Sequence, residues 1–415
     1  MNTEAALPEP SAGTRPAPAP GPRGIARIKS ALERAWWDAL EYLESAAQRH
    51  AARVLFTGSE KHSGAPLRLL YFGSGNHRAW IRDLAFREWR VESEQDAIRT
   101  WRARRAIAGR AMDADLVVAD MPWPWHRTLR GAGMAELPAW INQRFALPAN
   151  WPEVFPRLRR SARGEDMRSI RKNRLEYRLV RDEAAVRRFY EEMYVPHLKR
   201  RFGEAAYIEP EWKIRYCVEH GTLMEIRRDG ALVAAQVLWG SRGSLHFLWA
   251  GTTGEDFGSQ TRGVFPALYY YGIVHGFEQG FEEVDYCGSR PVLADGIFQI
   301  KRRWGAAVFD GWSRDTLFVR PRALAGAARE FLVRNPLVAR AAGGLVGKLL
   351  CPGAAAAADV ERAEQLYASD GIREIRIYSL EAPAADAIAA AAKSPGVKIV
   401  DLSREPDPAA AYCRS

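Results

Sequence analysis

The chain has 415 residues, of which 47% are hydrophobic and 11% aromatic, and its formal net charge is +10. This length and composition suffice for two or three domains with apolar cores, and no apolar run reaches the roughly 18 uncharged residues of a membrane-spanning helix. The positive charge favours an anionic partner, such as a CoA or nucleotide phosphate, an anionic lipid, a sugar phosphate or tRNA, without selecting among them.

The cysteines and histidines show no spacing that favours a metal site. The four cysteines are far apart in the sequence, and the eight histidines are scattered in the same way. We therefore predict no metal site, and widely spaced free thiols suit a reducing, cytoplasmic environment.

The N-terminal segment differs in composition from the rest of the chain. Residues 1–23 are dominated by Pro, Ala, Gly and Ser and lack the apolar stretch of a signal peptide, so they are predicted to be disordered. The next segment, Ile25–Ala52, has apolar residues at helical spacing with charges between them and is predicted to form an amphipathic helix.

From Leu67 onward the pattern alternates between strands and helices. Predicted strands cover Leu67–Phe72, Ile81–Trp89 and Asp115–Ala119. Gly73–Asn76 is predicted to be a plain turn, with a phosphate-binding loop as the alternative.

A basic stretch follows in the middle of the chain. Ten lysines and arginines lie between Arg157 and Arg181. This run indicates either a solvated linker and helix or a surface that attracts an anion.

The stretch from Thr222 to Gly305 carries the most informative order of elements. Its pattern predicts a three-stranded meander, a loop rich in Gly and Thr, a helix and a fourth strand: Thr222–Arg228, Ala231–Trp239, Leu245–Ala250, Gly251–Gly263, Phe265–Gln279 and Glu283–Cys287. Asp229 and Gly230 suit the tight turn between the first two strands.

The loop before this helix has the composition of an anion site. Backbone N–H groups at a helix start favour a phosphate or a carboxylate, and Arg262 adds a cation beside Gln260, Thr261 and Gly263. The alternative is an ordinary connection between a strand and a helix.

These features resemble the FemAB-like branch of the GNAT N-acyltransferases. Gln260–Gly263 partly resembles the pyrophosphate loop Gln/Arg-x-x-Gly-x-Gly/Ala, although Phe265 replaces its last small residue. The run Arg168–Asn173, the strand end Asp285–Gly288 and the segment Gly296–Gly305 add to the resemblance. It implies an α/β (α+β) fold with two GNAT-like domains and mixed, mostly antiparallel sheets.

The resemblance covers Leu137–Val319 well and suggests a division of the chain. We expect a disordered tail at 1–23, a first, degenerate GNAT-like domain at 24–150 and a second, FemAB-like domain at 151–320. Residues 321–415 are predicted to form a helical and β-α-β-like extension, whose function the sequence does not indicate. Its elements are expected at Asp359–Ala368, Glu374–Ser379, Pro383–Ala392 and Val397–Leu402.

The resemblance also implies where the chemistry occurs. In this fold the strands on either side of the loop and helix splay apart, so that backbone N–H groups can bind a thioester carbonyl. Asp285 and Tyr286 on the second splayed strand are the predicted catalytic residues, because a carboxylate, a tyrosine or an ordered water can take the amine proton. A purely structural role is the alternative for Asp285. Cys287 is disfavoured as a nucleophile, since no histidine lies near it in sequence to activate it.

The remaining predicted site residues fall into two sets. The expected cofactor-binding residues are Trp249, Ala250, Gln260, Thr261, Arg262 and Gly263. The expected substrate-binding cations are Arg171, Lys172, Lys301 and Arg302, for which a solvated basic surface is the alternative.

The resemblance implies an N-acyltransferase without a tightly bound cofactor. It would move an acyl group from acyl-CoA, as co-substrate, to an amine of a sugar, lipid or peptide precursor of the cell envelope or of a polysaccharide. One alternative is a Fem-type peptidyltransferase with aminoacyl-tRNA as donor. The other is a non-catalytic protein whose basic groove binds an anionic polymer or the periphery of a membrane; DNA is not an expected partner.

Overall fold

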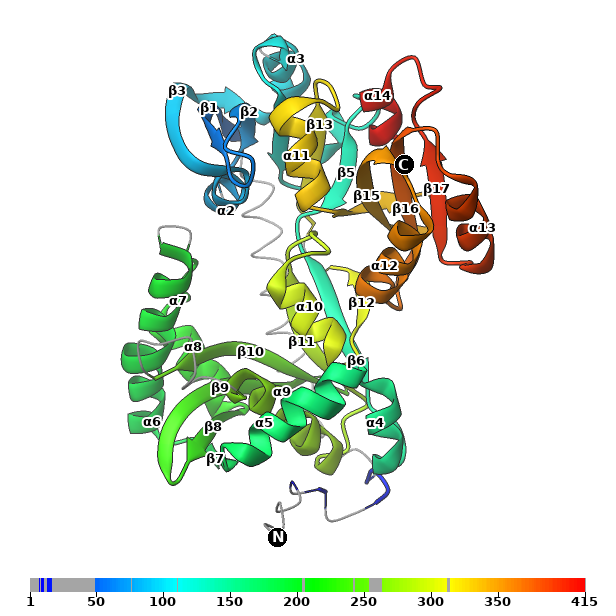
Figure 1. Cartoon of the computed structure of the whole chain (residues 1–415). Coiled ribbons are helices and arrows are strands. Elements are labelled where there is room, and N and C mark those ends of the chain that lie inside the picture. Colours follow the sequence, from blue (N-terminus) through cyan, green and yellow to red (C-terminus); the bar gives the residue numbers. More distant parts are fainter. Residues whose placement is uncertain are drawn as a thin grey trace. The chain divides into compact units, whose positions relative to one another are not determined.

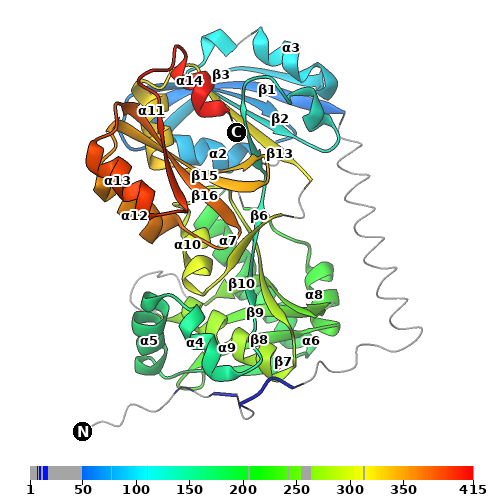
Figure 2. The same ribbon diagram turned by 90° about the vertical axis from the view of Figure 1, so that its right-hand side faces the viewer.

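The computed structural model describes residues 7, 9–10, 13–16, 49–75, 77–109, 111–203, 206–241, 243–253, 263–311 and 314–414 (Figures 1 and 2). The chain forms two compact units. Unit 1 comprises residues 1–24, 143–287 and 300–307, and unit 2 comprises residues 25–142, 288–299 and 308–415. Among the described residues, no helix is both long and apolar enough to cross a membrane.

A seven-stranded mixed sheet contains the strands of unit 1, together with one edge strand, Ala307–Asp310, of which only Ala307 belongs to that unit. Its order is β12-β6-β11-β10-β9-β8-β7. The strands are β6 (Ile141–Ala146), β7 (Leu175–Val180), β8 (Thr222–Arg228), β9 (Ala231–Ser241), β10 (Ser244–Thr252), β11 (Glu283–Ser289) and β12 (Ala307–Asp310). Neighbours from β7 to β10 are antiparallel, whereas β10 and β11 are parallel. The predicted meander and the strand after it are therefore confirmed.

Helices cover both faces of this sheet. On one face, α5 (Met167–Lys172) and α9 (Val264–Glu278) share a core with Leu245, Phe247 and Val284. On the other face, Val186, Ile214 and Val237 belong to a second core. The helical segments of that side are α6 (Glu183–Arg188), η6 (Phe189–Tyr194), α7 (Val195–Phe202) and α8 (Glu211–Glu219). Shorter helical segments of unit 1 are η4 (Trp151–Glu153), α4 (Val154–Arg157) and η5 (Ala162–Asp166), and α10 (Gly296–Arg303) ends in unit 1.

Helix α9 is the buried centre of unit 1. It is apolar on all sides, as expected for a helix covered by protein all round. A Cβ at Gly272 would lie only 2.1 Å from the Phe247 ring, so the missing side chain allows α9 to lie close against β10. The predicted helix at Phe265–Gln279 is confirmed with nearly the same ends.

Unit 2 begins with a six-stranded sheet of order β3-β1-β2-β4-β13-β5. Its strands are β1 (His50–Glu60), β2 (Pro66–Gly73), β3 (Phe86–Arg99), β4 (Leu116–Met121), β5 (Ala135–Pro138) and β13 (Thr316–Pro321). Only β2 and β4 are parallel neighbours, and the other pairs are antiparallel. The helical segments are α2 (Arg78–Ala85), η1 (Thr100–Arg102), α3 (Ala103–Ala108), η2 (Ala111–Asp113) and η3 (Trp125–Thr128).

The second sheet of unit 2 has the order β14-β15-β16-β17 (Figures 1 and 2). Its elements are α11 (Gly326–Arg334), β14 (Leu337–Ala341), β15 (Gly344–Ala354), α12 (Ala357–Tyr367), β16 (Ile372–Glu381), α13 (Ala385–Lys393), β17 (Val397–Asp401) and α14 (Pro408–Cys413). The last three strands are parallel and are connected through α12 and α13. The β-α-β pattern expected in this part of the chain is therefore present.

The predicted α/β class with mixed, mostly antiparallel sheets is confirmed, but the compact units divide the chain differently from the expected boundaries. The strand β13, which belongs to the predicted second domain, pairs with β4 and β5 in unit 2. The expected extension 321–415 falls in the same unit as β1 to β5. A local pattern predicts that a segment is a strand, but it does not encode which distant strand becomes its neighbour.

Two local expectations also differ from the structure. The predicted strand Ile81–Trp89 is wrong over its first half, where α2 buries Trp80, Ile81 and Ala85 before β3 begins at Phe86. Within the segment expected to be disordered, Thr14 bridges to Asn150. Apart from residues 7, 9–10 and 13–16, that segment lies outside the described residues, as does the predicted helix Ile25–Ala52 up to residue 48. The end of that predicted helix is wrong, because β1 begins at His50.

Candidate active site

The strands β10 and β11 form a fork in unit 1. Their parallel pairing covers only Ser244–His246 against Glu283–Asp285, although both strands are fully described beyond that point. The pairing of β10 with β9 is also irregular, with a register shift between Phe247 and Ala250. The strands therefore diverge just after the His246–Asp285 rung, as the resemblance implies for a splayed pair.

Strand alternation places polar side chains on one face of this fork. Residues such as Leu245, Phe247 and Val284 face the core under α9. Their neighbours in sequence therefore point to the opposite face, because successive side chains of a strand alternate. We call these residues the polar face: Arg144, Trp239, Ser241, Ser244, His246, Glu283 and Asp285.

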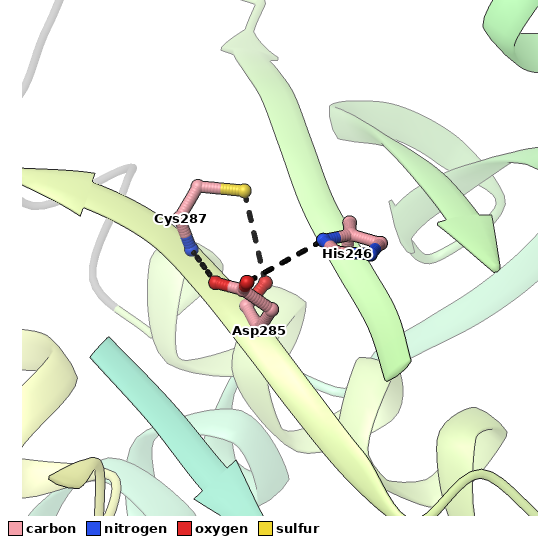
Figure 3. Close-up of side chains that lie close together, drawn as sticks. All are labelled: His246, Asp285 and Cys287. Atoms are coloured by element: carbon pink, nitrogen blue, oxygen red, sulfur yellow. Dashed lines mark hydrogen bonds and ion pairs between the residues drawn. The ribbon is translucent and has the colours of Figure 1, made fainter. Parts of the chain in front are cut away.

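Asp285 is the most enclosed residue of the polar face, with 3% of its surface exposed. Its Oδ2 lies 3.5 Å from His246 Nδ1 and 3.2 Å from Arg144 Nε. Its Oδ1 accepts a hydrogen bond of 2.7 Å from the Cys287 backbone N–H (Figure 3). Donors and positive charge thus meet both oxygens of this carboxylate.

These contacts decide the charge of Asp285. Burial by itself raises the pKa of the carboxyl, but the hydrogen bond and charge of His246, the Cys287 N–H and the Arg144 guanidinium together lower the pKa below its ordinary value. Asp285 is therefore an ionised carboxylate at neutral pH. A group with a lowered pKa is a weak proton acceptor, so Asp285 is better suited to orient His246 than to remove a proton itself.

His246 has a different partner on each ring nitrogen. Nδ1 faces the Asp285 carboxylate, and Nε2 lies 2.8 Å from the Ser241 hydroxyl oxygen. The carboxylate favours the tautomer with its proton on Nδ1, which leaves the Nε2 lone pair to accept the Ser241 hydroxyl proton. The side chain is 21% exposed. The histidine can therefore take up a proton at Nε2 while remaining in contact with solvent.

Cys287 marks the point where β11 turns. Its φ of +61° is rare for a residue other than glycine, and the Asp285 carboxylate holds its N–H in this conformation. Lys301 Nζ donates a hydrogen bond of 3.1 Å to the Cys287 carbonyl oxygen. Burial, followed by the charge of Asp285, raises the pKa of the Cys287 thiol to about 12, so the thiol is protonated at neutral pH.

His246, Asp285 and Cys287 could in principle hold a metal ion, since one donor atom of each lies within 4.8 Å of the others. The surroundings argue against a cation. The Arg144 guanidinium already contacts the carboxylate, and Lys301 adds a second positive charge beside Cys287. These residues are better suited to proton transfer than to metal binding.

Tyr286, the second predicted catalytic residue, points to the other side of β11. It is 2% exposed, and its hydroxyl donates a hydrogen bond of 3.1 Å to the Trp304 carbonyl oxygen. Burial raises its pKa well above the ordinary value. The structure thus gives Tyr286 a position in the core rather than beside His246.

The predicted cofactor-binding residues are only partly described. Gln260, Thr261 and Arg262 lie outside the described residues. Trp249 and Ala250 follow the register shift in β10, on the diverging arm of the fork. Gly263 is the residue before α9, with φ of +85°, and a Cβ there would lie 2.7 Å from Ser169 Oγ of α5. Both the left-handed conformation and this close approach require glycine.

The predicted substrate-binding cations lie in two places. Arg171 and Lys172 end α5, which packs against α9, so they belong to the side of the sheet opposite the polar face. Lys301 is brought to the Cys287 carbonyl. Arg302 is 6% exposed, and burial, followed by the charge of Arg159, lowers its pKa to about 10.

Sequence reasoning missed His246, Ser241 and Arg144. The signal for the first two was present, because alternate positions of the predicted strands place Ser241 and His246 on the face that also carries Asp285. Arg144 could not be found in this way, since β6 lies far from β11 in the sequence and becomes its neighbour only in the folded sheet.

No protein-family model and no curated protein matches the sequence. Among solved structures, FemX is similar with a TM-score of 0.35 and 11% identity over 67% of this chain and 90% of that one. L-PGS from Bacillus licheniformis has a TM-score of 0.32 and 10% identity over 68% and 87% of the two chains. A GCN5-related N-acetyltransferase from Kribbella flavida has a TM-score of 0.28 and 12% identity over 79% and 69%. These TM-scores and identities are too low to indicate a function for this chain.

Proposed function

We propose that the protein is an acyltransferase that acylates an amine, with His246 as the general base. The observation that carries the proposal is the His246–Asp285 pair on the last shared rung of the fork. A primary amine is protonated at neutral pH and must lose protons to become the nitrogen of an amide. His246 Nε2 can accept a proton, and Asp285 stabilises the imidazolium that results.

The diverging arm of β10 supports the second requirement, which is stabilisation of the developing oxyanion. The register shift takes Leu248 and Trp249 out of the regular ladder with β9. In the proposed site, N–H groups of this arm, at Trp249 and Ala250, donate to the carbonyl oxygen of the acyl donor. Fixed backbone donors of this kind typically contribute about 10²–10³ in rate.

An acyl-CoA donor is supported by the start of α9. This helix has 15 residues and begins directly after Gly263, so its N-terminal N–H groups and its dipole favour a phosphate at that end. Gln260, Thr261 and Arg262 immediately precede it in the sequence and would complete the pyrophosphate site. Lys301 and Arg302 are the cations proposed to hold the acceptor, because Lys301 already lies beside Cys287.

The experiment supplies the full chain with acetyl-CoA, longer acyl-CoAs or aminoacyl-tRNA, each with and without a panel of amino sugars, amine-bearing lipids and peptides. We expect CoA at millimolar concentration and low salt to raise the melting temperature by mass action, and release of the CoA thiol to accelerate when the right amine is present. Consumption of aminoacyl-tRNA instead would keep acyl transfer and replace the donor. If no donor is consumed and none changes the melting temperature, the protein is not an acyltransferase, and a basic binding protein becomes the better description.

A further inference from the structure

The hydroxyl of Ser241, the imidazole of His246 and the carboxylate of Asp285 lie side by side, in that order, on the polar face. Ser241 Oγ lies 2.8 Å from His246 Nε2, and Asp285 Oδ2 lies 3.5 Å from His246 Nδ1. The two ring nitrogens thus have the partners that activate a serine, with the hydroxyl on Nε2 and the carboxylate on Nδ1. The three residues come from three neighbouring strands, β9, β10 and β11.

The connection between β9 and β10 fixes the position of Ser241. Ser241 is the last residue of β9, and Gly243 follows with φ of +84°. The carbonyl oxygen of Gly243 accepts hydrogen bonds from the N–H groups of Glu282 at 2.7 Å and Glu283 at 3.3 Å. These bonds tie the connection to the start of β11, so the strand that carries Ser241 is held beside the strand that carries Asp285.

The other nucleophilic side chains of this region are less suited to attack. Ser244 lies on the same face, but its hydroxyl donates to the Glu283 carboxylate rather than to an imidazole. The Glu283 carboxylate also contacts Arg144 and therefore already has a cationic partner. The Cys287 thiol is held in its protonated form. Ser241 is half-buried and therefore reachable from solvent beside the exposed edge of His246.

We infer that Ser241 is a covalent nucleophile, so that the acyl group passes through a Ser241 ester before it reaches the amine. This inference rests on the proposed function, because it specifies how the same site transfers the acyl group. It replaces direct attack of the amine on the donor by two successive transfers.

The first transfer loads the serine. Ser241 Oγ attacks the carbonyl carbon of the donor thioester while His246 Nε2 takes the hydroxyl proton. The tetrahedral adduct then collapses with cleavage of the C–S bond, and the departing sulfur receives the proton from His246. The products are a free thiol and an acyl ester on Ser241.

The second transfer unloads it. The neutral acceptor amine attacks the ester carbonyl carbon and gives one proton to His246 Nε2. The C–O bond to Ser241 then breaks, and Ser241 Oγ recovers the proton from His246 as the amide leaves. Asp285 remains ionised throughout and stabilises the imidazolium in both transfers.

The experiment separates loading from transfer. The full chain is mixed with acetyl-CoA without an amine, quenched in acid and digested, and the peptide that contains Ser241 is examined by mass spectrometry. We expect one acetyl group on Ser241 in the wild type and in the matched control Ser244→Ala, and none in Ser241→Ala or His246→Gln. With an amine that the wild type acylates, Ser241→Ala should lose at least about 100-fold in kcat.

The outcomes distinguish the two proposals. A Ser241→Ala protein that keeps at least half of the wild-type transfer rate overturns the inference and leaves the acyltransferase intact. The same holds if Ser241 stays unmodified while the wild type releases thiol. A fluorophosphonate probe tests the serine without any acyl donor: labelling of Ser241 that is lost in His246→Gln supports an activated serine even if acyl transfer is not observed. Failure of this labelling in a folded wild type overturns it.

Discussion

The two units each bury an aspartate at the same place in a pair of parallel strands. Asp285 occupies the last rung that β11 shares with β10, and Asp120 occupies the last rung that β4 shares with β2. A histidine lies close to each carboxylate, because His246 Nδ1 is 3.5 Å from Asp285 and His77 Nε2 is 4.0 Å from Asp120. The residue types of the two His–Asp pairs and the strand positions of the two aspartates are therefore the same.

The partners of the two carboxylates differ. Asp285 contacts the cation Arg144, and its histidine is partly exposed. Asp120 is fully buried, and its Oδ2 accepts hydrogen bonds from the hydroxyls of Tyr71 at 2.8 Å and Ser74 at 3.3 Å and from the His77 N–H at 3.3 Å. Within the described part of the chain, Asp120 Oδ1 has no hydrogen-bond partner.

The partners of the two histidines differ as well. His77 Nδ1 accepts a hydrogen bond of 3.1 Å from the Trp80 indole, so in the neutral ring the proton sits on Nε2. This histidine is 4% exposed, and its Nε2 lies 4.0 Å from Asp120 Oδ1; among the described residues no hydroxyl forms a hydrogen bond with this nitrogen. His246 instead offers a lone pair at Nε2 to the hydroxyl of Ser241. The second partner of the histidine, rather than its distance from the carboxylate, separates a site that can move protons from a polar centre that holds a fold together.

The largest expected effect compares Asp285→Asn with Asp120→Asn. An amide at position 285 removes the charge that stabilises the imidazolium and offers an N–H to Nδ1, which favours the wrong tautomer of His246. We expect kcat to fall by about 10²–10⁴ for Asp285→Asn with little change in the KM of the donor, and by less than about threefold for Asp120→Asn. Steady-state kinetics of the two variants measure this difference. Equal losses of kcat would show that the two pairs are not functionally distinct.

The next effect concerns stability and runs in the opposite direction. Asp120→Ala leaves the buried Tyr71 hydroxyl and two further donors without their acceptor, whereas Asp285→Ala leaves Arg144 able to turn to solvent. We expect Asp120→Ala to lower the free energy of unfolding by about 2–4 kcal/mol and Asp285→Ala to lower it by less.

Amide hydrogen exchange measures these losses of stability. It should be followed separately for peptides from β2 and from β10, because a chain with two units need not unfold in a single step. The control is Ser93→Ala on the exposed strand β3, which should leave both peptides unchanged. A larger loss of protection for Asp285→Ala than for Asp120→Ala would contradict the assignment of the two centres.

The sequence predicted the fold better than the site, and particular residues explain why. The meander, α9 and β11 follow from periodicity and turn residues, which act locally. Asp285 was predicted because it lies on the second strand of the expected splayed pair, and its role stays a prediction. His246 and Ser241 depend on the register between strands, and Arg144 depends on the position of β6 in the sheet, so none of the three is fixed by a local pattern. Tyr286 follows Asp285 in the same strand, so its side chain lies on the opposite side, in the core and away from His246.

The smallest expected effect tests the cation that distinguishes Asp285 from Asp120. Arg144 is one of the groups that lower the pKa of Asp285, so Arg144→Gln should raise that pKa. A carboxyl with a lowered pKa in the folded state stabilises the protein above its unfolded value, near 3.8, and this stabilisation is lost as the pH falls through the folded pKa. In Arg144→Gln stability should therefore decline at a higher pH on acidification, while kcat at neutral pH stays close to that of the wild type, because Asp285 is still ionised there. The melting temperature between pH 3 and 7 measures the shift. Arg188→Gln is the matched control, since Arg188 pairs with the buried Glu225 in the same unit and away from His246. If the fall in stability on acidification moves to higher pH by the same amount in both variants, the shift comes from the loss of any positive charge. The contact between Arg144 and Asp285 would then not set the ionisation of this site.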